Sequence, residues 1–207
     1  SDNVRLRNVK DANNILINSG LLVEANPFND DKKLCIEIGT GKGDFIIGMA
    51  RNNPDVNFIG IEKYPSVLVR AVQKIEDIPG NLRFMCFDAK NICDYFDHNV
   101  DTIYLNFSDP WPKARHAKRR LTSETFLPLY EKISKGDVHI IQKTDNKGLF
   151  AYSLEMFNNY GYKFNKISLD LTNSDIPNVR SEYENKFISL GQTINYADVI
   201  KSLPNDK

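Results

Sequence analysis

A glycine-rich turn follows the first apolar run of the sequence and has the composition of a ligand-binding loop. It reads Glu37-Ile38-Gly39-Thr40-Gly41-Lys42-Gly43-Asp44, and glycines in such a turn let a ligand approach the backbone closely. A dinucleotide fingerprint would need its third glycine at position 44, and a P-loop would need Ser or Thr after Lys42. The turn fits neither pattern. With the carboxylate of Glu37 beside it, the turn instead favours a cationic cofactor that carries an amino acid group and no phosphate.

Two more acidic residues, Glu62 and Asp88, follow the next two apolar runs. Glu62 stands about 20 residues after the turn, where an acid can accept hydrogen bonds from ribose hydroxyls. Asp88, with Ala89 beside it, could bind the exocyclic amino group of adenine. Because open α/β sheets bind ligands at the carboxyl ends of their strands, Glu37, Glu62 and Asp88 together predict a nucleoside pocket. Each acid taken alone could also be a helix N-cap or a solvated loop residue.

A stiff loop that contains an acid, Ser108-Asp109-Pro110-Trp111-Pro112, follows the fourth apolar run. We expect it at the same edge of the sheet, where a substrate base should meet the cofactor. Its two prolines restrict the backbone, so Asp109 is held in place. Trp111 is the only tryptophan of the chain, and it could stack on a base or cover the core.

A dense basic run follows this loop, in a chain whose net charge is zero. No acidic residue stands between Pro110 and Ser123, a stretch that also contains His116. Contact with nucleic-acid phosphates is the simplest explanation, and a solvated surface is the alternative. The residues expected to contact phosphates are Lys113, Arg115, Lys118, Arg119 and Arg120, together with Arg5 and Arg7 of an N-terminal arm.

The elements that position these residues follow from the alternation of short apolar runs with amphipathic stretches, which is typical of α/β proteins. Parallel strands are expected at Leu34–Ile38, Asn57–Ile61, Leu82–Phe87, Thr102–Phe107 and Val138–Gln142. Helices are expected at Asp44–Asn52, Pro65–Glu76, Ser123–Ile133 and Lys147–Tyr160. Two later apolar runs, Tyr162–Leu169 and Lys186–Leu190, predict an antiparallel pair. The predicted fold class is therefore α/β, with a seven-stranded Rossmann-like sheet of five parallel strands plus an antiparallel edge pair, and helices on both faces.

The length of 207 residues and the hydrophobic fraction of 41% suit one core with short appendages. We expect an arm and a short helix over residues 1–30, with the helix at Asp11–Ser19 ended by Gly20. A single domain should cover residues 31–196 and a tail residues 197–207. No run approaches the roughly 18 apolar residues of a membrane span, and no signal region is visible, so a cytoplasmic protein without membrane contact is expected. The cysteines and histidines lack metal-ligand spacing, which predicts no metal.

Four motifs occur in the order that they have in the tRNA (guanine-N7)-methyltransferase family, which the sequence closely resembles from Arg5 to about Gly191. The motifs are Glu37–Gly43, Ser108–Lys113 with Arg115–Leu121, Lys143-Thr144-Asp145, and Ser181-Glu182-Tyr183-Glu184. The first is shared by many methyltransferases, whereas the second is highly specific. The resemblance implies a class I methyltransferase fold over residues 31–196, S-adenosyl-L-methionine as cofactor, tRNA as partner, and methylation of a guanine in the variable loop. The protein is expected to be a monomer or a homodimer.

The resemblance also implies which residues contact the cofactor and the substrate. Cofactor contacts are expected from Glu37, Glu62, Asp88 and Asp109, to which the turn adds Gly39, Gly41 and Gly43, and the third strand end adds Ala89. Substrate contacts are expected from Lys113, Asp145, Ser181, Glu182, Tyr183 and Glu184. The family usually has Thr where this chain has Ser181, and the serine keeps the hydroxyl.

The chemistry of guanine N7 limits the mechanism. N7 has a lone pair and no proton, so attack on a sulfonium methyl is a direct displacement without a general base, and positioning should dominate catalysis. Asp109 is the candidate for stabilising the positive charge that develops on the purine. Asp145 could instead accept hydrogen bonds from the guanine N1–H and N2 amino group. Tyr183 and Glu184 could close over the base, although a tyrosine can also simply pack on a neighbouring loop.

Three other functions are weighed against this one. An exocyclic-amino RNA methyltransferase would hold its amine with an acid-Pro-Pro-aromatic loop, but Pro112 stands after the aromatic residue here. A non-catalytic RNA-binding subunit with the same fold would be favoured if the acids expected to contact the cofactor were lost. All four of them are present: Glu37, Glu62, Asp88 and Asp109. A nicotinamide oxidoreductase conflicts with the spacing of the third glycine.

Overall fold

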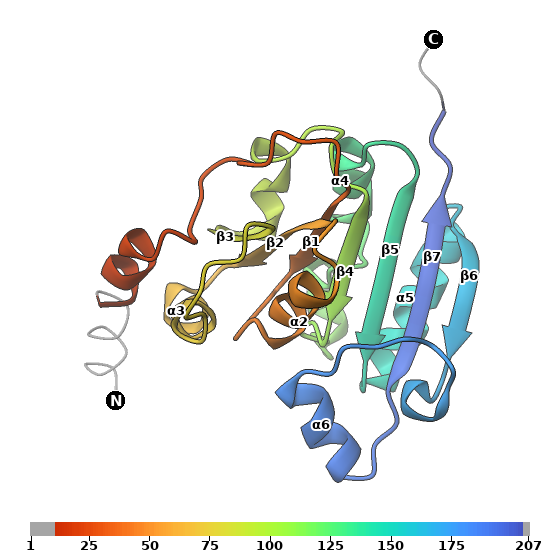
Figure 1. Ribbon diagram of the computed structural model, residues 1–207. Helices are drawn as coiled ribbons and strands as arrows, with labels where there is room; N and C mark the ends of the chain where they lie inside the picture. Colours follow the sequence, from red (N-terminus) through yellow and green to blue (C-terminus); the bar gives the residue numbers. More distant parts are fainter. Residues whose placement is uncertain (1–10, 205–207) are drawn as a thin grey trace. The chain divides into compact units, whose positions relative to one another are not determined.

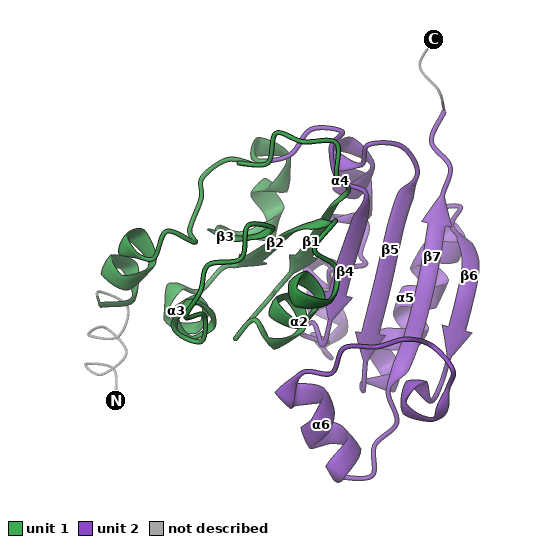
Figure 2. Ribbon diagram, viewed as in Figure 1, with its two compact units in different colours: residues 1–95 green, residues 96–207 purple. Residues whose placement is uncertain are grey.

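The computed structural model describes residues 11–204, and the chain divides into two compact units. Unit 1 extends to Tyr95 and unit 2 begins at Phe96 (Figure 2). Arg5 and Arg7, two of the residues expected to contact phosphates, lie outside the described residues. None of the helices within residues 11–204 is both long enough and apolar enough to cross a membrane.

Unit 1 contains three parallel strands in the order β3-β2-β1 (Figure 1). Residues 11–18 are helical, as expected, and Gly20 follows them with a φ of 73°. The later elements are β1 (Leu34–Ile38), α2 (Asp44–Asn52), β2 (Asn57–Glu62), α3 (Pro65–Gln73), β3 (Leu82–Cys86) and the 3₁₀ helix η1 (Ala89–Asp94). All residues of β1 are buried, as is usual for a parallel strand. Pro65 occupies the start of α3, where its missing N–H costs nothing.

Unit 2 contains four strands in the order β4-β5-β7-β6. Strand β4 is parallel to β5, and β7 pairs antiparallel with both β5 and β6. The elements are β4 (Thr102–Asn106), the 3₁₀ helix η2 (Ala114–Arg119), α4 (Leu127–Ile133), β5 (Val138–Thr144), α5 (Lys147–Asn159), β6 (Lys163–Ser168), the 3₁₀ helix η3 (Leu171–Asn173), α6 (Glu182–Ser189) and β7 (Asn195–Lys201). The arrowheads of β4 and β5 point toward the end of the unit where α6 lies (Figure 1).

One predicted strand is wrong. Lys186–Leu190 does not form the second strand of the edge pair, because α6 covers residues 182–189 and β7 begins only at Asn195. The helix is favoured by its first turn: the Ser181 hydroxyl accepts a hydrogen bond from the Glu184 N–H, at 3.2 Å, as an N-cap does. Strand β7 also includes residues 197–201, which the sequence places in a tail. The expected antiparallel pair is therefore β6 with β7.

Candidate functional site

The glycine turn of unit 1 adopts a backbone that only glycine tolerates well. Gly39, Gly41 and Gly43 have φ values of 78°, 59° and 79°, in the left-handed region. A Cβ at Gly39 or Gly41 would meet nothing within 4 Å, whereas one at Gly43 would lie 2.7 Å from the Cβ of Ala71. The first two glycines thus leave the backbone open to a ligand, and the third is required for packing between α2 and α3.

Two of the predicted cofactor acids stabilise this turn. Glu37 is buried and its carboxylate accepts a hydrogen bond from the Thr40 hydroxyl at 2.5 Å. Glu62, the last residue of β2, accepts the Gly41 N–H on one oxygen and the Tyr64 N–H on the other, both at 3.1 Å. A carboxylate has about four lone-pair positions, so Glu62 can accept further hydrogen bonds while it holds the turn.

The third acid, Asp88, lies directly before η1, whose first residue is Ala89. Its side chain accepts the Lys90 N–H at 3.0 Å and lies 3.3 Å from the Lys63 ammonium. The hydrogen bond from the Lys90 backbone lowers the pKa of Asp88, an effect that partial burial opposes and Lys63 reinforces. Asp88 is therefore an N-cap in this structure. This is the role that the sequence left open for it beside a contact with the cofactor. An exposed pair such as Lys63–Asp88 contributes little to stability, so Asp88 remains available to a ligand.

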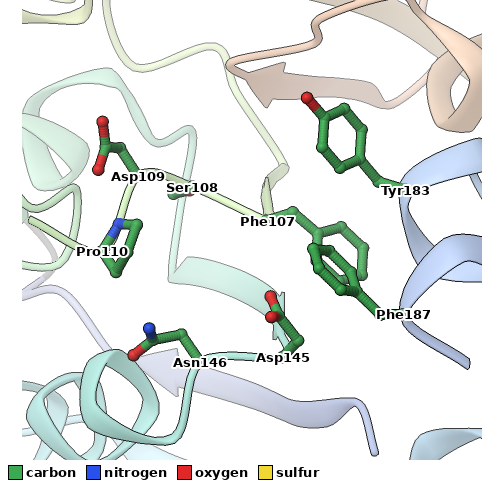
Figure 3. A pocket seen from close by; sticks show the side chains of 8 residues that line it. All are labelled: Phe107, Ser108, Asp109, Pro110, Asp145, Asn146, Tyr183 and Phe187. Atoms are coloured by element: carbon green, nitrogen blue, oxygen red, sulfur yellow. The ribbon is translucent and has the colours of Figure 1, made fainter. Parts of the chain in front are cut away.

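Unit 2 contains a pocket of about 230 Å³ between the loop after β4, the end of β5 and helix α6 (Figure 3). Pockets for drug-sized ligands are usually about 300–1,000 Å³, so this one suits a single base. Asp109 and Asp145 lie on different sides of it, and the aromatic side chains gather on a third side (Figure 3). The lining residues are Phe107, Ser108, Asp109, Pro110, Asp145, Asn146, Tyr183 and Phe187.

The wall formed by α6 is aromatic. The ring centroids of Phe107 and Phe187 are 5.8 Å apart, and those of Tyr183 and Phe187 are 6.3 Å apart, distances at which rings stack or pack edge to face. Tyr183 is 57% exposed, so much of its side chain is open to solvent. Ser108 also lines the pocket, and its buried hydroxyl has no hydrogen-bond partner within residues 11–204.

The loop that carries Asp109 is strained and braced. Phe107 and Trp111 have positive φ values of 53° and 44°, which are unusual for residues with bulky side chains. Asp109 accepts the Trp111 N–H at 3.1 Å. The Arg120 guanidinium donates to the carbonyls of Pro110 at 3.0 Å and Trp111 at 2.9 Å, and it lies 4.5 Å from the centre of the Tyr152 ring. Asp109 is therefore held, as its prolines predict, with Arg120 as an additional brace.

This bracing gives Arg120, which the sequence predicts to contact phosphates, a role within the protein. Its guanidinium is already bonded to the loop, whereas Lys113, Arg115, Lys118 and Arg119 are exposed. Arg119 lies 4.9 Å from the centre of the Trp111 ring, and His116 meets the same ring edge-on. Trp111 thus packs against the basic segment η2 rather than covering the core.

The residues of the segment Ser181–Glu184 differ in burial. Glu182 and Tyr183 are exposed, while Ser181 caps α6. Glu184 is fully buried and its carboxylate lies 2.7 Å from the ammonium of Lys143, which is buried too. In this structure Glu184 is thus not open to a substrate, contrary to its expected contact. Lys143 belongs to the motif Lys143-Thr144-Asp145, but the sequence predicts no role for its side chain. A lysine is seldom buried without a partner.

Comparison with known proteins identifies close relatives. A family model described as "Putative methyltransferase" matches residues 31–197. A protein of an Exiguobacterium species, named tRNA (guanine-N(7)-)-methyltransferase, is 55% identical over 81% of this chain and 79% of its own length. Proteins with the same name from Bacillus subtilis and Streptococcus pneumoniae are 51% and 45% identical, the first over 83% of this chain and 82% of its own length, the second over 92% and 97%.

Solved structures resemble this chain at low sequence identity. An antibiotic-related methyltransferase has a TM-score of 0.61 at 19% identity, over 94% of both chains. A 16S rRNA (adenine(1408)-N(1))-methyltransferase from Catenulisporales acidiphilia has a TM-score of 0.62 at 12% identity, over 95% of this chain and 94% of its own. At such identities the likeness shows the fold alone. It confirms the predicted seven-stranded class I methyltransferase fold.

The bracing of the Asp109 loop predicts different effects for two adjacent arginines. Arg120→Ala should lower the free energy of unfolding by roughly 1–3 kcal/mol, because two carbonyls lose a charged donor. Arg119→Ala, its matched control, loses only an exposed cation–π contact with Trp111 and should change it by about 0.5 kcal/mol. Urea unfolding followed by the fluorescence of Trp111 would measure both. Equal effects of the two substitutions would contradict the assignment.

Proposed function

The chain belongs to the tRNA (guanine-N7)-methyltransferase family, and from this we propose that it transfers a methyl group from S-adenosylmethionine to N7 of a guanine in the variable loop of tRNA. The reaction is a direct displacement without a general base. The single feature that supports this proposal most is the pocket of unit 2, in which two carboxylates and an aromatic wall border a space the size of one base. That set of side chains suits a base that becomes cationic.

The donor set of unit 1 fits S-adenosylmethionine, which supplies a methyl group on a positively charged sulfur. Open space at Gly39 and Gly41 lets a ligand reach the backbone. The remaining lone pairs of Glu62 can accept ribose hydroxyls. Asp88 can accept an adenine amino group once Lys63 moves away, and Glu37 supplies negative charge beside the turn. No basic cradle for a pyrophosphate is needed for this ligand.

Asp145 is the residue we assign to recognition of the guanine. It follows β5 directly, and its carboxylate points into the space between Asp109 and Tyr183 (Figure 3). A carboxylate can accept two donors side by side, and guanine presents N1–H and the N2 amino group in that arrangement. Tyr183 and Phe187 then contact the face of the base. Adenine, which has no N1–H, would leave the carboxylate unsatisfied.

Asp109 is the residue we assign to the chemical step. Methylation places a positive charge on the imidazole ring of the purine, and a fixed carboxylate stabilises that charge as it develops. Because the Trp111 N–H and Arg120 hold the loop before substrate binds, little reorganisation is needed during the reaction. The guanine N7 lone pair needs no proton removed, so Asp109 acts by charge and position.

The exposed cations of η2 and its flanks position the RNA by its phosphates. Lys113, Arg115, Lys118 and Arg119 extend from the loop that carries Asp109, so a phosphate bound there lies beside the pocket. Lys118 pairs with Glu124 at 3.5 Å, and both side chains are exposed enough for a phosphate to replace Glu124 at small cost.

Removing either carboxylate charge should impair methylation. In single-turnover assays at saturating tRNA, Asp109→Asn should slow methyl transfer about a hundredfold, since a fixed group that stabilises transition-state charge has effects of that order. Asp145→Asn should lower kcat/KM by about tenfold or more, because its amide offers a donor to the guanine N–H groups. Asp137→Asn, an exposed acid before β5, is the control. Wild-type rates in Asp109→Asn would rule out its electrostatic role.

Neutralising the basic segment should weaken tRNA binding more than the chemical step. A variant combining Arg115→Ala, Lys118→Ala and Arg119→Ala should show a flatter log–log dependence of affinity on salt, by about 0.9 per lost contact with duplex phosphate and less for single strands. Binding titrations between about 50 and 200 mM salt measure this slope. Replacing three exposed lysines elsewhere in unit 2, Lys132, Lys135 and Lys163, gives a control of equal charge. An equal loss of slope in both variants would show a general charge effect and no defined RNA contact.

A further inference from the structure

A buried ion pair lies next to the pocket without lining it. The side chains of Lys143 and Glu184 are 3% and 0% exposed, and neither is among the residues that border the pocket. The Lys143 ammonium donates to the Glu184 carboxylate at 2.7 Å, to the Asn178 side-chain oxygen at 2.8 Å and to the Val179 carbonyl at 3.2 Å. These three acceptors match the three N–H donors of an ammonium. The pair is therefore fully hydrogen-bonded on the lysine side.

The carboxylate of Glu184 is also held from more than one direction. Its second oxygen accepts a hydrogen bond from the Asn178 amide at 2.5 Å, and the Arg180 Nε lies 4.0 Å away. The Glu184 backbone N–H bonds to the Ser181 hydroxyl. Glu184 thus joins the segment before α6 to the first turn of that helix. Through Lys143, both are fixed to the end of β5.

Lys143 is also linked to Phe107, which lines the pocket. Its backbone carbonyl accepts the Phe107 N–H at 2.8 Å, and its ammonium lies 5.9 Å from the centre of the Phe107 ring. Asp145 follows it by two residues in the chain. Lys143 therefore connects three parts of the pocket: its backbone bonds to Phe107 at the start of the Asp109 loop, the chain leads from it to Asp145, and its side chain bonds to Glu184 of α6.

Stability alone does not account for this pair. Desolvating two charges costs several kcal/mol per ion, and well-packed apolar residues often serve as well or better in the same place. The better-documented role of a buried ion pair is to fix one arrangement of the chain. Here the arrangement that it fixes is the position of α6 relative to the end of β5.

We propose that Lys143 is a positioning residue for methyl transfer: its ammonium docks α6 through Glu184, so that Tyr183 and Phe187 face Asp145 across the base pocket. Glu184 acts through Lys143 and does not contact the substrate. The inference rests on the proposed function, because it assigns these two residues to the arrangement of the proposed guanine pocket.

A double-mutant cycle tests this relation. Lys143→Met and Glu184→Gln should each slow single-turnover methylation about a hundredfold at saturating tRNA, the effect of a small misplacement of the reacting groups. The affinity for S-adenosylmethionine should not change, and that for tRNA should fall much less than the rate, because phosphate contacts supply most of the RNA binding. The double variant should be no slower than the slower single variant, since residues that act as one unit are not additive. Losses that multiply would show an independent contact of Glu184 with substrate and overturn the proposal.

Two further variants keep the test decisive. Lys201→Met is the matched control, because it breaks another Lys–Glu pair, the 2.8 Å contact between Lys201 on β7 and Glu131 on α4, and it should leave methylation unchanged. If Lys143→Met does not fold, Asn178→Ala removes one bond from each partner and leaves the ion pair. It should slow methylation severalfold and speed hydrogen exchange in residues 182–189. A wild-type rate in Asn178→Ala with unprotected α6 amides would overturn the proposal.

The outcomes separate this inference from the function on which it rests. If the wild-type protein methylates guanine N7 in tRNA and the Lys143 variants do so at the same rate, only the positioning role fails. If the wild-type protein produces no 7-methylguanosine in tRNA, the proposed function itself fails.

Discussion

The carboxyl ends of parallel strands meet at one edge of a sheet, and the functional side chains of each unit depend on this constraint. In unit 1 it places Glu62 at the end of β2, beside the glycine turn that follows β1. In unit 2 it places Asp109 after β4 and Asp145 after β5, on the border of one pocket. Residues distant in sequence thereby become neighbours, and the loops need only orient them.

Orientation in unit 2 relies on charged side chains that are buried or partly buried. Arg120 bonds to the loop carbonyls beside Asp109, and Lys143 with Glu184 holds α6 at the end of β5. Positive φ values at Phe107 and Trp111 add strain to the same loop. Strain and buried charge are tolerated where they fix a geometry that function requires. In the proposed reaction, positive charge passes from the sulfonium sulfur to the base, and a carboxylate held in advance would stabilise that charge as it develops.

Local sequence patterns predict most of the fold and part of the site. The parallel strands are short apolar runs, and Gly43 stands in a glycine-rich turn where its φ of 79° favours glycine. Both features can be recognised in the sequence. The strand expected at Lys186–Leu190 is a helix because Ser181 caps it and Glu184 finds a buried partner, and that partner is 41 residues away. Arg120 likewise braces the loop because the fold brings its guanidinium to the carbonyls of Pro110 and Trp111 and to the ring of Tyr152. Sequence spacing identifies charged residues, but whether each faces solvent or a distant partner is decided by tertiary packing.

The most direct test of the account is to locate the methyl group that the protein transfers. Bulk tRNA without modifications is incubated with S-adenosylmethionine labelled in its methyl group, digested to nucleosides, and mapped by mass spectrometry. The proposed function predicts label in 7-methylguanosine, at one position in the variable loop. Label on an exocyclic amino group, label spread over many guanines, or no label in tRNA would contradict it.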